Sequence, residues 1–134
     1  MKPVFKPLFL VLFSLILFGA ANAQLKDGDI VQIKNINSGK YAVPQDVSTA
    51  ADAQIVINTG RNDAWFTWKV IIAPGGYYKF QNLHTGYYLG ILGSSKAVYG
   101  FVVQRASGRA VDLLWSLVKT TKGYKIKNKN SGLL

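Results

Sequence analysis

Few side chains in this sequence could carry out covalent chemistry. The 134 residues include six acidic residues, all of them Asp, together with one His and no Cys. A hydrolase needs a positioned carboxylate pair or a nucleophile with its base. No such motif is formed by the loop residues Asp46, Asp52, Asp63 and Asp112. His84 without any Cys or Glu offers no metal ligand set, and the sequence has no glycine-rich phosphate-binding motif. We therefore expect no catalytic residue, no metal and no cofactor.

A strand followed by an asparagine-rich turn occurs three times. The turns are residues 35–39 (Asn-Ile-Asn-Ser-Gly), 82–86 (Asn-Leu-His-Thr-Gly) and 128–132 (Asn-Lys-Asn-Ser-Gly). Their glycines are separated by 47 residues (86 − 39) and 46 residues (132 − 86). The Asn side chain of such a turn can bond to nearby backbone, and the Gly allows a positive φ. Two nearly equal intervals indicate an internal repeat.

The repeated pattern continues beyond the turns. Trp68 and Trp115 each lie 29 residues after a turn glycine (68 − 39 and 115 − 86), and Val56 aligns with Val103 between them. Each unit reads as strand, turn, strand, loop, short apolar strand, loop and a Trp-bearing strand, expected at 65–72 and 113–118. Repeated short strands without helical periodicity predict an all-β closed fold around one central core.

The first 23 residues have the features of a secretory signal peptide. Lys2 and Lys6 precede the apolar run 8–18, and Ala21-Asn22-Ala23 is a small-residue cleavage site. The run is too short for a membrane-spanning helix, which needs roughly 20 apolar residues. We expect residues 1–23 to be removed and residues 24–134 to form one domain. The protein is then secreted or periplasmic, without stable membrane insertion.

The charge of the exported chain is strongly positive. Without Lys2 and Lys6, 14 basic residues face 6 acidic ones, a net charge of +8 (14 − 6). Lys125, Lys127 and Lys129 alternate and therefore share one face of a strand and its turn. We interpret this face as a solvated surface, and the alternative is contact with an anionic polysaccharide or cell surface. Nucleic acid is not an expected partner of an exported protein.

The opening motif Asn-x-x-Ser/Thr-Gly-x-Tyr/Leu, with a Trp strand about 30 residues later, resembles the ricin B-type β-trefoil lectin family. The resemblance covers the chain from about Asp29 to the end. It implies a β-trefoil of three repeats, at about 29–75, 76–121 and 122–134, with the third incomplete. It also implies a non-catalytic, carbohydrate-binding module with shallow pockets, potentially one in each unit.

The chain departs from the family pattern at its polar positions. Phe66 and Leu113 stand where the closing Gln-x-Trp signature of the family has Gln. Val43 and Gly90 stand where the family has a sugar-binding Asp, whose carboxylate accepts hydrogen bonds from sugar hydroxyls. The alternative function is therefore a protein-interaction or structural trefoil whose sugar sites are degenerate.

Aromatic and polar side chains near the expected pockets are the candidate carbohydrate-binding residues. Trp65 lies an odd number of positions from Trp68, faces the other way on the expected strand, and is the candidate platform for a sugar ring. Tyr41 and Tyr88 share a strand face with the positions where the family has its sugar-binding Asp. These tyrosines either stack on a sugar or cover the surface. The full set is Tyr41, Asn58, Trp65, Tyr88, Arg105 and Asp112.

Equivalent apolar positions of the units are expected in one core. Trp68 and Trp115 belong there rather than at a sugar site, because their offsets match and apolar residues flank them. His84 is expected to be a turn residue. The other sets expected to be buried are Ile33, Phe80 and Ile126; Ala42 and Leu89; and Val56 and Val103.

The third unit contains only a strand and a turn. By the same offset its Trp would fall near position 161 (132 + 29), beyond Leu134. We expect the sequence to be a piece of a longer chain, with a degenerate trefoil as the alternative. One side of the core should then be open, and Ile126 should be less buried than Ile33 or Phe80.

Overall fold

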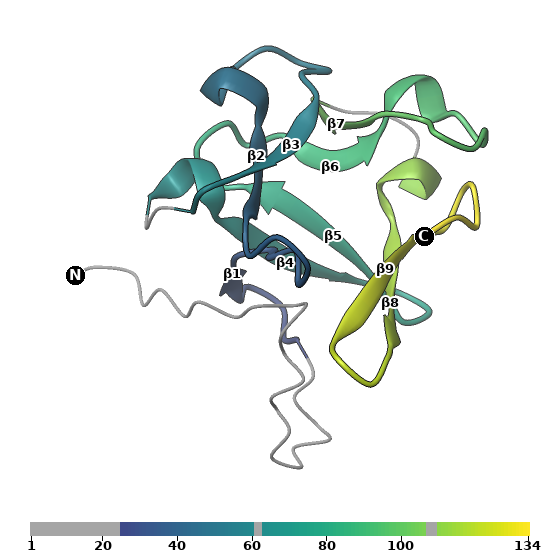
Figure 1. Ribbon diagram of the computed structural model, residues 1–134. Coiled ribbons are helices and arrows are strands. Elements are labelled where there is room, and N and C mark those ends of the chain that lie inside the picture. Colours follow the sequence, from purple (N-terminus) through teal and green to yellow (C-terminus); the bar gives the residue numbers. More distant parts are fainter. Residues whose placement is uncertain (1–24, 61–62, 107–109) are drawn as a thin grey trace.

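The structure is a computed structural model that describes residues 25–60, 63–106 and 110–134. The expected signal peptide and the expected first residue of the exported chain, Gln24, lie outside the described residues. The strands are β1 (Ile30–Val31), β2 (Tyr41–Pro44), β3 (Ile55–Asn58), β4 (Trp68–Ala73), β5 (Tyr77–Asn82), β6 (Tyr88–Ile91), β7 (Val102–Arg105), β8 (Trp115–Lys119) and β9 (Tyr124–Asn128). The order β1 to β4 in unit one therefore recurs as β5 to β8 in unit two, and β9 opens unit three (Figure 1).

All of the strand pairs are antiparallel. β4 pairs with β1 and β5, β6 pairs with β5 and β7, and β8 pairs with β5 and β9. β2 and β3 form a separate two-stranded sheet. An isolated bridge between Gln54 and Val103 joins the residue before β3 to β7. The predicted all-β trefoil, with two full units and the start of a third, is confirmed.

The three turns have the predicted chemistry. Asn82 Oδ1 accepts hydrogen bonds from the backbone N–H groups of His84 and Thr85, at 2.9 and 3.0 Å. Asn128 Oδ1 does the same for Asn130 and Ser131, at 3.1 and 3.2 Å. The three turn glycines have φ values between 72° and 77°, a region that favours Gly. These turns fix how each unit's first strand connects to its second.

The two repeated tryptophans form the centre of the core, as predicted. Trp68 and Phe80 are fully buried, and Trp115 is almost so. The indole Nε1 of Trp68 donates to Ala42 O at 3.3 Å, and that of Trp115 donates to Leu89 O at 3.0 Å. The equivalent hydrogen bond in each unit satisfies the one polar group of a buried indole.

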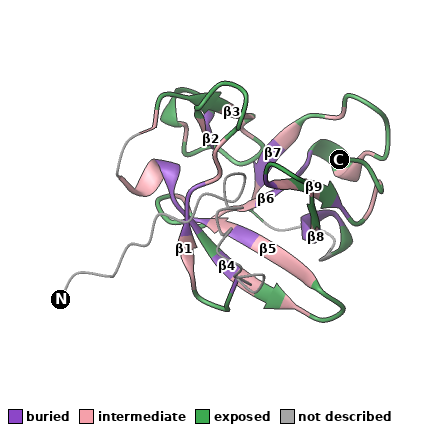
Figure 2. Cartoon of the chain, turned by 60° about the horizontal axis from the view of Figure 1, so that its bottom comes forward, coloured by how far each residue is buried: buried purple, intermediate pink, exposed green. Residues whose placement is uncertain are grey.

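Three residues that were expected to be buried are only partly buried. Ile33, Val56 and Ile126 are of intermediate exposure, and all three line a cavity of about 870 Å³ that we call the central groove. This apolar groove lies where β3, β6, β7, β8 and β9 approach one another, and it leaves one side of these side chains uncovered. Ile126 is less buried than Phe80, as expected. Figure 2 shows buried stretches on β5 and β7, whereas β3 has no buried residue.

The predicted strands 65–72 and 113–118 begin too early. Residues Ala64–Phe66 form a 3-10 turn, η4, in which Asp63 Oδ1 accepts from the Trp65 N–H at 3.1 Å, and β4 begins only at Trp68. Leu113 ends the equivalent turn η6 (Ala110–Leu113) before β8. Trp65 therefore does not alternate with Trp68 on one strand. In the described part of the chain, no helix has the length and apolar character needed to cross a bilayer.

The basic strand β9 is solvated on one face, as predicted. Lys125, Lys127 and Lys129 are all exposed, and Lys129 Nζ lies 4.4 Å from the ring centre of Tyr77. Burial raises the pKa of the Tyr78 phenol, and the nearby Tyr124 of β9 raises it further.

Candidate functional site

Unit one carries an open pocket of about 490 Å³, which we call the unit-one pocket. It lies over the β2–β3 hairpin, beside the 3-10 turn η3 (Gln45–Val47) and η4. Its lining residues are Val43, Pro44, Asp46, Val47, Val56, Asn58, Thr59 and Phe66. Its volume is within the range of small-ligand sites.

The floor of the unit-one pocket is apolar because β2 and β3 pair through apolar residues. Val43 lies opposite Val56 in the ladder, and Val43 is buried. Phe66, at the position of the family's Gln, is also buried. An apolar floor of this kind suits the C–H face of a ring-shaped ligand.

The rim of the unit-one pocket is polar. Asp46 is exposed and has a φ of 55°, a left-handed conformation that Asp tolerates better than most residues. Asn58 Oδ1 accepts a hydrogen bond from the Thr59 N–H at 2.8 Å. Within the described residues, the Asn58 Nδ2 group has no acceptor. The rim thus offers a carboxylate acceptor and an amide donor.

Tyr41 lies next to this rim. It is opposite Asn58 in the β2–β3 ladder and is half-buried. Lys34 Nζ lies 5.7 Å from the centre of its ring. Its ring packs against the backbone of Gly60, where a β-carbon would collide with it. The structure therefore brings together two of the predicted residues, Tyr41 and Asn58, beside one pocket.

The equivalent place in unit two is filled by Arg105. Tyr88 lies opposite Arg105 in the β6–β7 ladder, just as Tyr41 lies opposite Asn58. Gly90, at the position of Val43, makes room for this side chain. A β-carbon at Gly90 would lie 2.8 Å from Arg105 Cγ and 2.9 Å from Leu113 Cδ2. Glycine is required here by close packing rather than by a positive φ.

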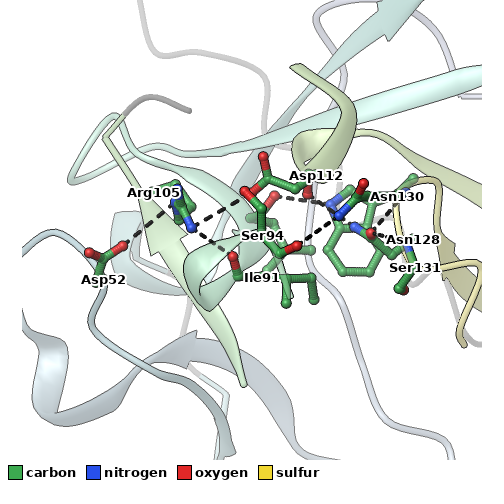
Figure 3. Close-up of polar contacts among 10 residues, drawn as sticks. Asp52, Ile91, Ser94, Arg105, Asp112, Asn128, Asn130 and Ser131 are labelled. Carbon is green, nitrogen blue, oxygen red and sulfur yellow. Dashed lines mark hydrogen bonds and ion pairs between the residues drawn. The ribbon is translucent and has the colours of Figure 1, made fainter. Parts of the chain in front are cut away.

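Arg105 is held by a chain of polar contacts (Figure 3). Its Nη1 donates to Ile91 O at 2.7 Å and lies 3.7 Å from Asp112 Oδ2. Its Nε lies 3.6 Å from Asp52 Oδ1. Asp112 is fully buried, and neither of its carboxylate oxygens has a hydrogen-bond partner among the described residues. The Arg105 cation is therefore the charge that compensates a buried carboxylate.

Trp65 is not among the residues that line the unit-one pocket, although its neighbour Phe66 is. The Trp65 ring stacks on His84 with the ring centres 3.7 Å apart and the planes 25° apart. Its carbonyl accepts from Asn82 Nδ2 at 3.0 Å, an interaction that Asp112 repeats with Asn128 Nδ2. One face of the indole is thus covered by His84, which the sequence had indicated only as a turn residue.

The six predicted residues therefore fall into three places. Tyr41 and Asn58 border the unit-one pocket. Arg105 and Asp112 fill its counterpart, with Tyr88 opposite Arg105, while Trp65 packs on His84. Sequence reasoning missed Asp46 and Thr59. The signal for Asp46 was its alignment with Gly93, since both take the same left-handed turn conformation. In the described residues, no three His, Asp, Glu or Cys side chains gather in a way that could hold a metal ion.

Comparison with known proteins agrees with this architecture. Residues 17–98 and 68–134 match the model of the ricin-type β-trefoil lectin domain-like family, and the chain belongs to that family. No curated protein sequence matches the chain.

Several solved structures share the fold. The designed 3-fold symmetric protein ThreeFoil has a TM-score of 0.73 and 24% identity, over 77% of this chain and 74% of its own. The Rhizoctonia solani agglutinin has a TM-score of 0.68 and 22% identity, over 81% of this chain and 73% of its own. The exo-β-1,3-galactanase 1,3Gal43A from Clostridium thermocellum has a TM-score of 0.70 and 28% identity, over 82% of this chain but only 23% of its own.

Proposed function

We propose that the protein is a non-catalytic carbohydrate-binding module and that the unit-one pocket holds the sugar. The observation that carries this proposal is an open pocket with an apolar floor and a polar rim in a ricin-type lectin domain. The names of the structural neighbours, an agglutinin and a galactanase, support a carbohydrate as the ligand class.

The chemistry of the rim suits a ring that carries hydroxyl groups. The Asp46 carboxylate accepts hydrogen bonds from hydroxyls, and bonds to an ionised acceptor are the stronger kind. Asn58 Nδ2 donates to a ring or hydroxyl oxygen, and the Thr59 hydroxyl can do either. Val43 and Val56 contact the C–H face. A carboxylate on the rim favours a neutral sugar over an anionic one in this pocket, so an anionic polysaccharide would instead contact the lysine face of β9.

The comparison between units sets the expected valency. Arg105 fills the place in unit two that is open in unit one, so one mole of protein should bind one mole of a monovalent sugar. The expected affinity is modest, because a shallow, partly exposed pocket leaves much of the ligand in water.

The test is a glycan array followed by calorimetry with the best neutral oligosaccharide. Replacing Asn58 by Ala should weaken binding at least tenfold, because a donor and its neighbouring contacts are lost. The control is Lys127→Ala on the exposed face of β9, which should leave the affinity unchanged. An array without any bound glycan, or equal binding by the Asn58→Ala variant, would contradict the proposal.

We also propose that the protein is exported and loses residues 1–23. The charged start, the apolar run and the Ala-x-Ala site support this cleavage. Amino-terminal sequencing of the protein recovered outside the cytoplasm should begin at Gln24. Recovery of a chain that keeps Met1 in an integral membrane fraction would contradict it.

A further inference from the structure

Charge is divided very unequally along the chain. Residues 24–63, which include the unit-one pocket, have four basic and five acidic residues, a net charge of −1 (4 − 5). Residues 64–134 have ten basic residues and one acidic residue, a net charge of +9 (10 − 1). That acidic residue is Asp112, which is fully buried. The described part of residues 64–134 therefore exposes cations and no acidic side chain.

Five of these cations share one side of the sheet, which we call the basic sheet face. Neighbouring residues along a strand lie on opposite faces of a sheet. Phe80 and Asn128 are buried, so the adjacent Lys79 of β5 and Lys127 of β9 point outward. β8 pairs with both β5 and β9 and joins them into one sheet (Figure 1). The lysines of the basic sheet face are Lys69, Lys79, Lys125, Lys127 and Lys129.

Two tyrosines position lysines of the basic sheet face. Lys129 Nζ lies 4.4 Å from the ring centre of Tyr77, a contact that connects the turn after β9 to β5. Lys79 Nζ lies 5.7 Å from the ring centre of Tyr88 on β6. The negative face of an aromatic ring attracts an ammonium group at such distances. Lysines and tyrosines therefore alternate from β9 across β5 to β6, and these contacts orient the charges without neutralising them.

The basic sheet face has no acidic partner within the described residues. The ion pairs shown there join Arg105 to Asp52 and to Asp112, and neither involves a lysine of this face. Like charges that share a surface repel one another, and an anion that lies across them relieves this repulsion. Strands pair through their edges, so the outward side chains stay accessible whichever segment pairs with β9. The basic sheet face is therefore suited to an anionic ligand.

The arrangement of the charges indicates a linear polymer rather than a small anion. Lys125 and Lys127 alternate on β9, which places their Cα atoms about 7 Å apart in a row. Among the described residues, no lysine lines the central groove or the unit-one pocket, so these cations do not converge on one point. A ligand that contacts several of them must itself carry negative charges at repeated intervals.

The polar character of the basic sheet face favours a polysaccharide over other anionic partners. Membrane binding needs apolar side chains that enter the bilayer, and a protein interface needs apolar or aromatic anchors at its centre. The outward positions of β5 and β9, all within the described residues, hold no exposed large apolar side chain. Tyr77 and Tyr88 are half-buried with a lysine over each ring, so neither offers an open ring on which a nucleic-acid base could stack.

We propose that the basic sheet face binds a linear acidic polysaccharide, which crosses β9 and β5 with its carboxylates against Lys127, Lys129 and Lys79. This site is separate from the unit-one pocket and does not depend on it. The pocket has the Asp46 carboxylate on its rim and lies in the part of the chain without excess positive charge. One domain would thus hold a neutral sugar and an acidic polymer at two different places.

The test is calorimetry with a purified oligogalacturonate at low ionic strength and without divalent cations. The matched ligand is the same oligosaccharide with its carboxylates methyl-esterified, which keeps the sugar rings and removes the charge. The acidic form should bind at least about tenfold more tightly than the ester, and its affinity should fall steeply with added salt, because salt screens exposed charges. Equal affinities for the two forms, or binding that salt does not weaken, would overturn the proposal.

A pair of triple variants separates the basic sheet face from net charge alone. The first removes three cations of the face, by Lys79→Gln, Lys127→Gln and Lys129→Gln. It should bind the oligogalacturonate about tenfold more weakly, because three ion pairs are lost. The control removes the same charge from exposed positions outside the face, by Lys26→Gln, Lys40→Gln and Lys96→Gln. Its affinity should fall less than about twofold, since distant charges are screened. Equal losses in the two variants would overturn the proposal.

Further measurements distinguish this site from the unit-one pocket and from other anions. Asn58→Ala should bind the oligogalacturonate as the unchanged protein does, whereas a loss of binding would place the polymer in the unit-one pocket and overturn the proposal. Phosphatidylglycerol vesicles and single-stranded DNA are titrated in parallel. Tighter binding of either than of the oligogalacturonate, abolished by the first triple variant, would show that the face recognises lipid or nucleic acid instead.

Discussion

Unit one and unit two place the same backbone around different side chains. Asn58 and Arg105 lie opposite equivalent tyrosines in their ladders, yet one borders an open pocket and the other fills it. The residues at the position of Val43 differ in size to match. Unit one has the Val43 side chain there, whereas unit two has Gly90, whose missing side chain leaves the space that Arg105 occupies. The comparison teaches that one side chain on the third strand of a unit decides whether its pocket is open to a ligand.

The two units also differ in the contact that stabilises the residue at the position of Asp112. In unit two, Arg105 compensates the buried Asp112, and the residue at the position of Asp112 in unit one is Trp65, which stacks on His84. Unit two therefore depends on an internal ion pair where unit one depends on an aromatic pair. The unit-one rim residues Asp46, Asn58 and Thr59 take part in neither the ion pair nor the aromatic stack, so their side chains can bind a ligand.

The largest loss of stability is expected from removing the Arg105 cation. Arg105→Ala leaves Asp112 buried without a compensating charge and should lower the free energy of unfolding by about 3–5 kcal/mol. Asn58→Ala, at the equivalent exposed position, should change it by no more than about 0.5 kcal/mol. Urea denaturation of the two variants measures both values.

A double variant tests the cause of this loss. Asp112→Asn added to Arg105→Ala removes the buried charge and should recover part of the lost stability. Similar stability of the Arg105→Ala and Asn58→Ala variants would show that Arg105 has no structural role and that the two units do not differ in this way.

A smaller effect is expected from crowding the filled pocket. Gly90→Ala adds a β-carbon 2.8 Å from Arg105 Cγ and 2.9 Å from Leu113 Cδ2. Such overpacking costs about 1–3 kcal/mol. The midpoint of thermal unfolding should fall accordingly, while Lys127→Ala should leave it unchanged. A neutral Gly90→Ala variant would mean that Arg105 swings away from Gly90 in solution.

Of these three contacts, the stack of Trp65 on His84 should contribute least to the free energy of unfolding. His84→Ala removes one partner of the stack and should cost about 0.5–1.5 kcal/mol beyond the area it exposes. It uncovers a face of Trp65, so the tryptophan fluorescence should shift to longer wavelength. Sugar affinity should stay the same. A large rise in sugar affinity would instead support Trp65 as the platform that its position in the sequence suggested.

Repeat spacing was enough to predict a closed all-β fold, and the family resemblance identified that fold as a trefoil. The core was predicted correctly at Trp68, Trp115 and Phe80 but not at Ile33, Val56 and Ile126, which are only partly buried. Both tryptophans also have carbonyl partners at equivalent positions, which no spacing alone indicates. Strand starts were misjudged at Trp65 and Leu113, because a 3-10 turn precedes each Trp strand and alternation cannot be read through it.

The site was only partly predictable. The family pattern directed attention to a carboxylate at Val43 and Gly90, where there is none, and away from Asp46, whose turn conformation brings it to the rim. Arg105 and Asp112 were selected as polar loop residues, but their contact depends on how η6 packs on β6. That packing is a tertiary property, which the sequence does not reveal. Arg105 and Asp112 were therefore predicted to line a pocket, although in the structure they close it.

The most direct test of the account is a ¹⁵N titration of the protein with the best neutral oligosaccharide from the array. We predict shifts concentrated at Asp46, Asn58 and Thr59, with a stoichiometry of one and no shift at Arg105 or Asp112. Shifts at Arg105 and Asp112 with none at Asn58 would contradict it, because they would place the sugar in the unit whose pocket is closed.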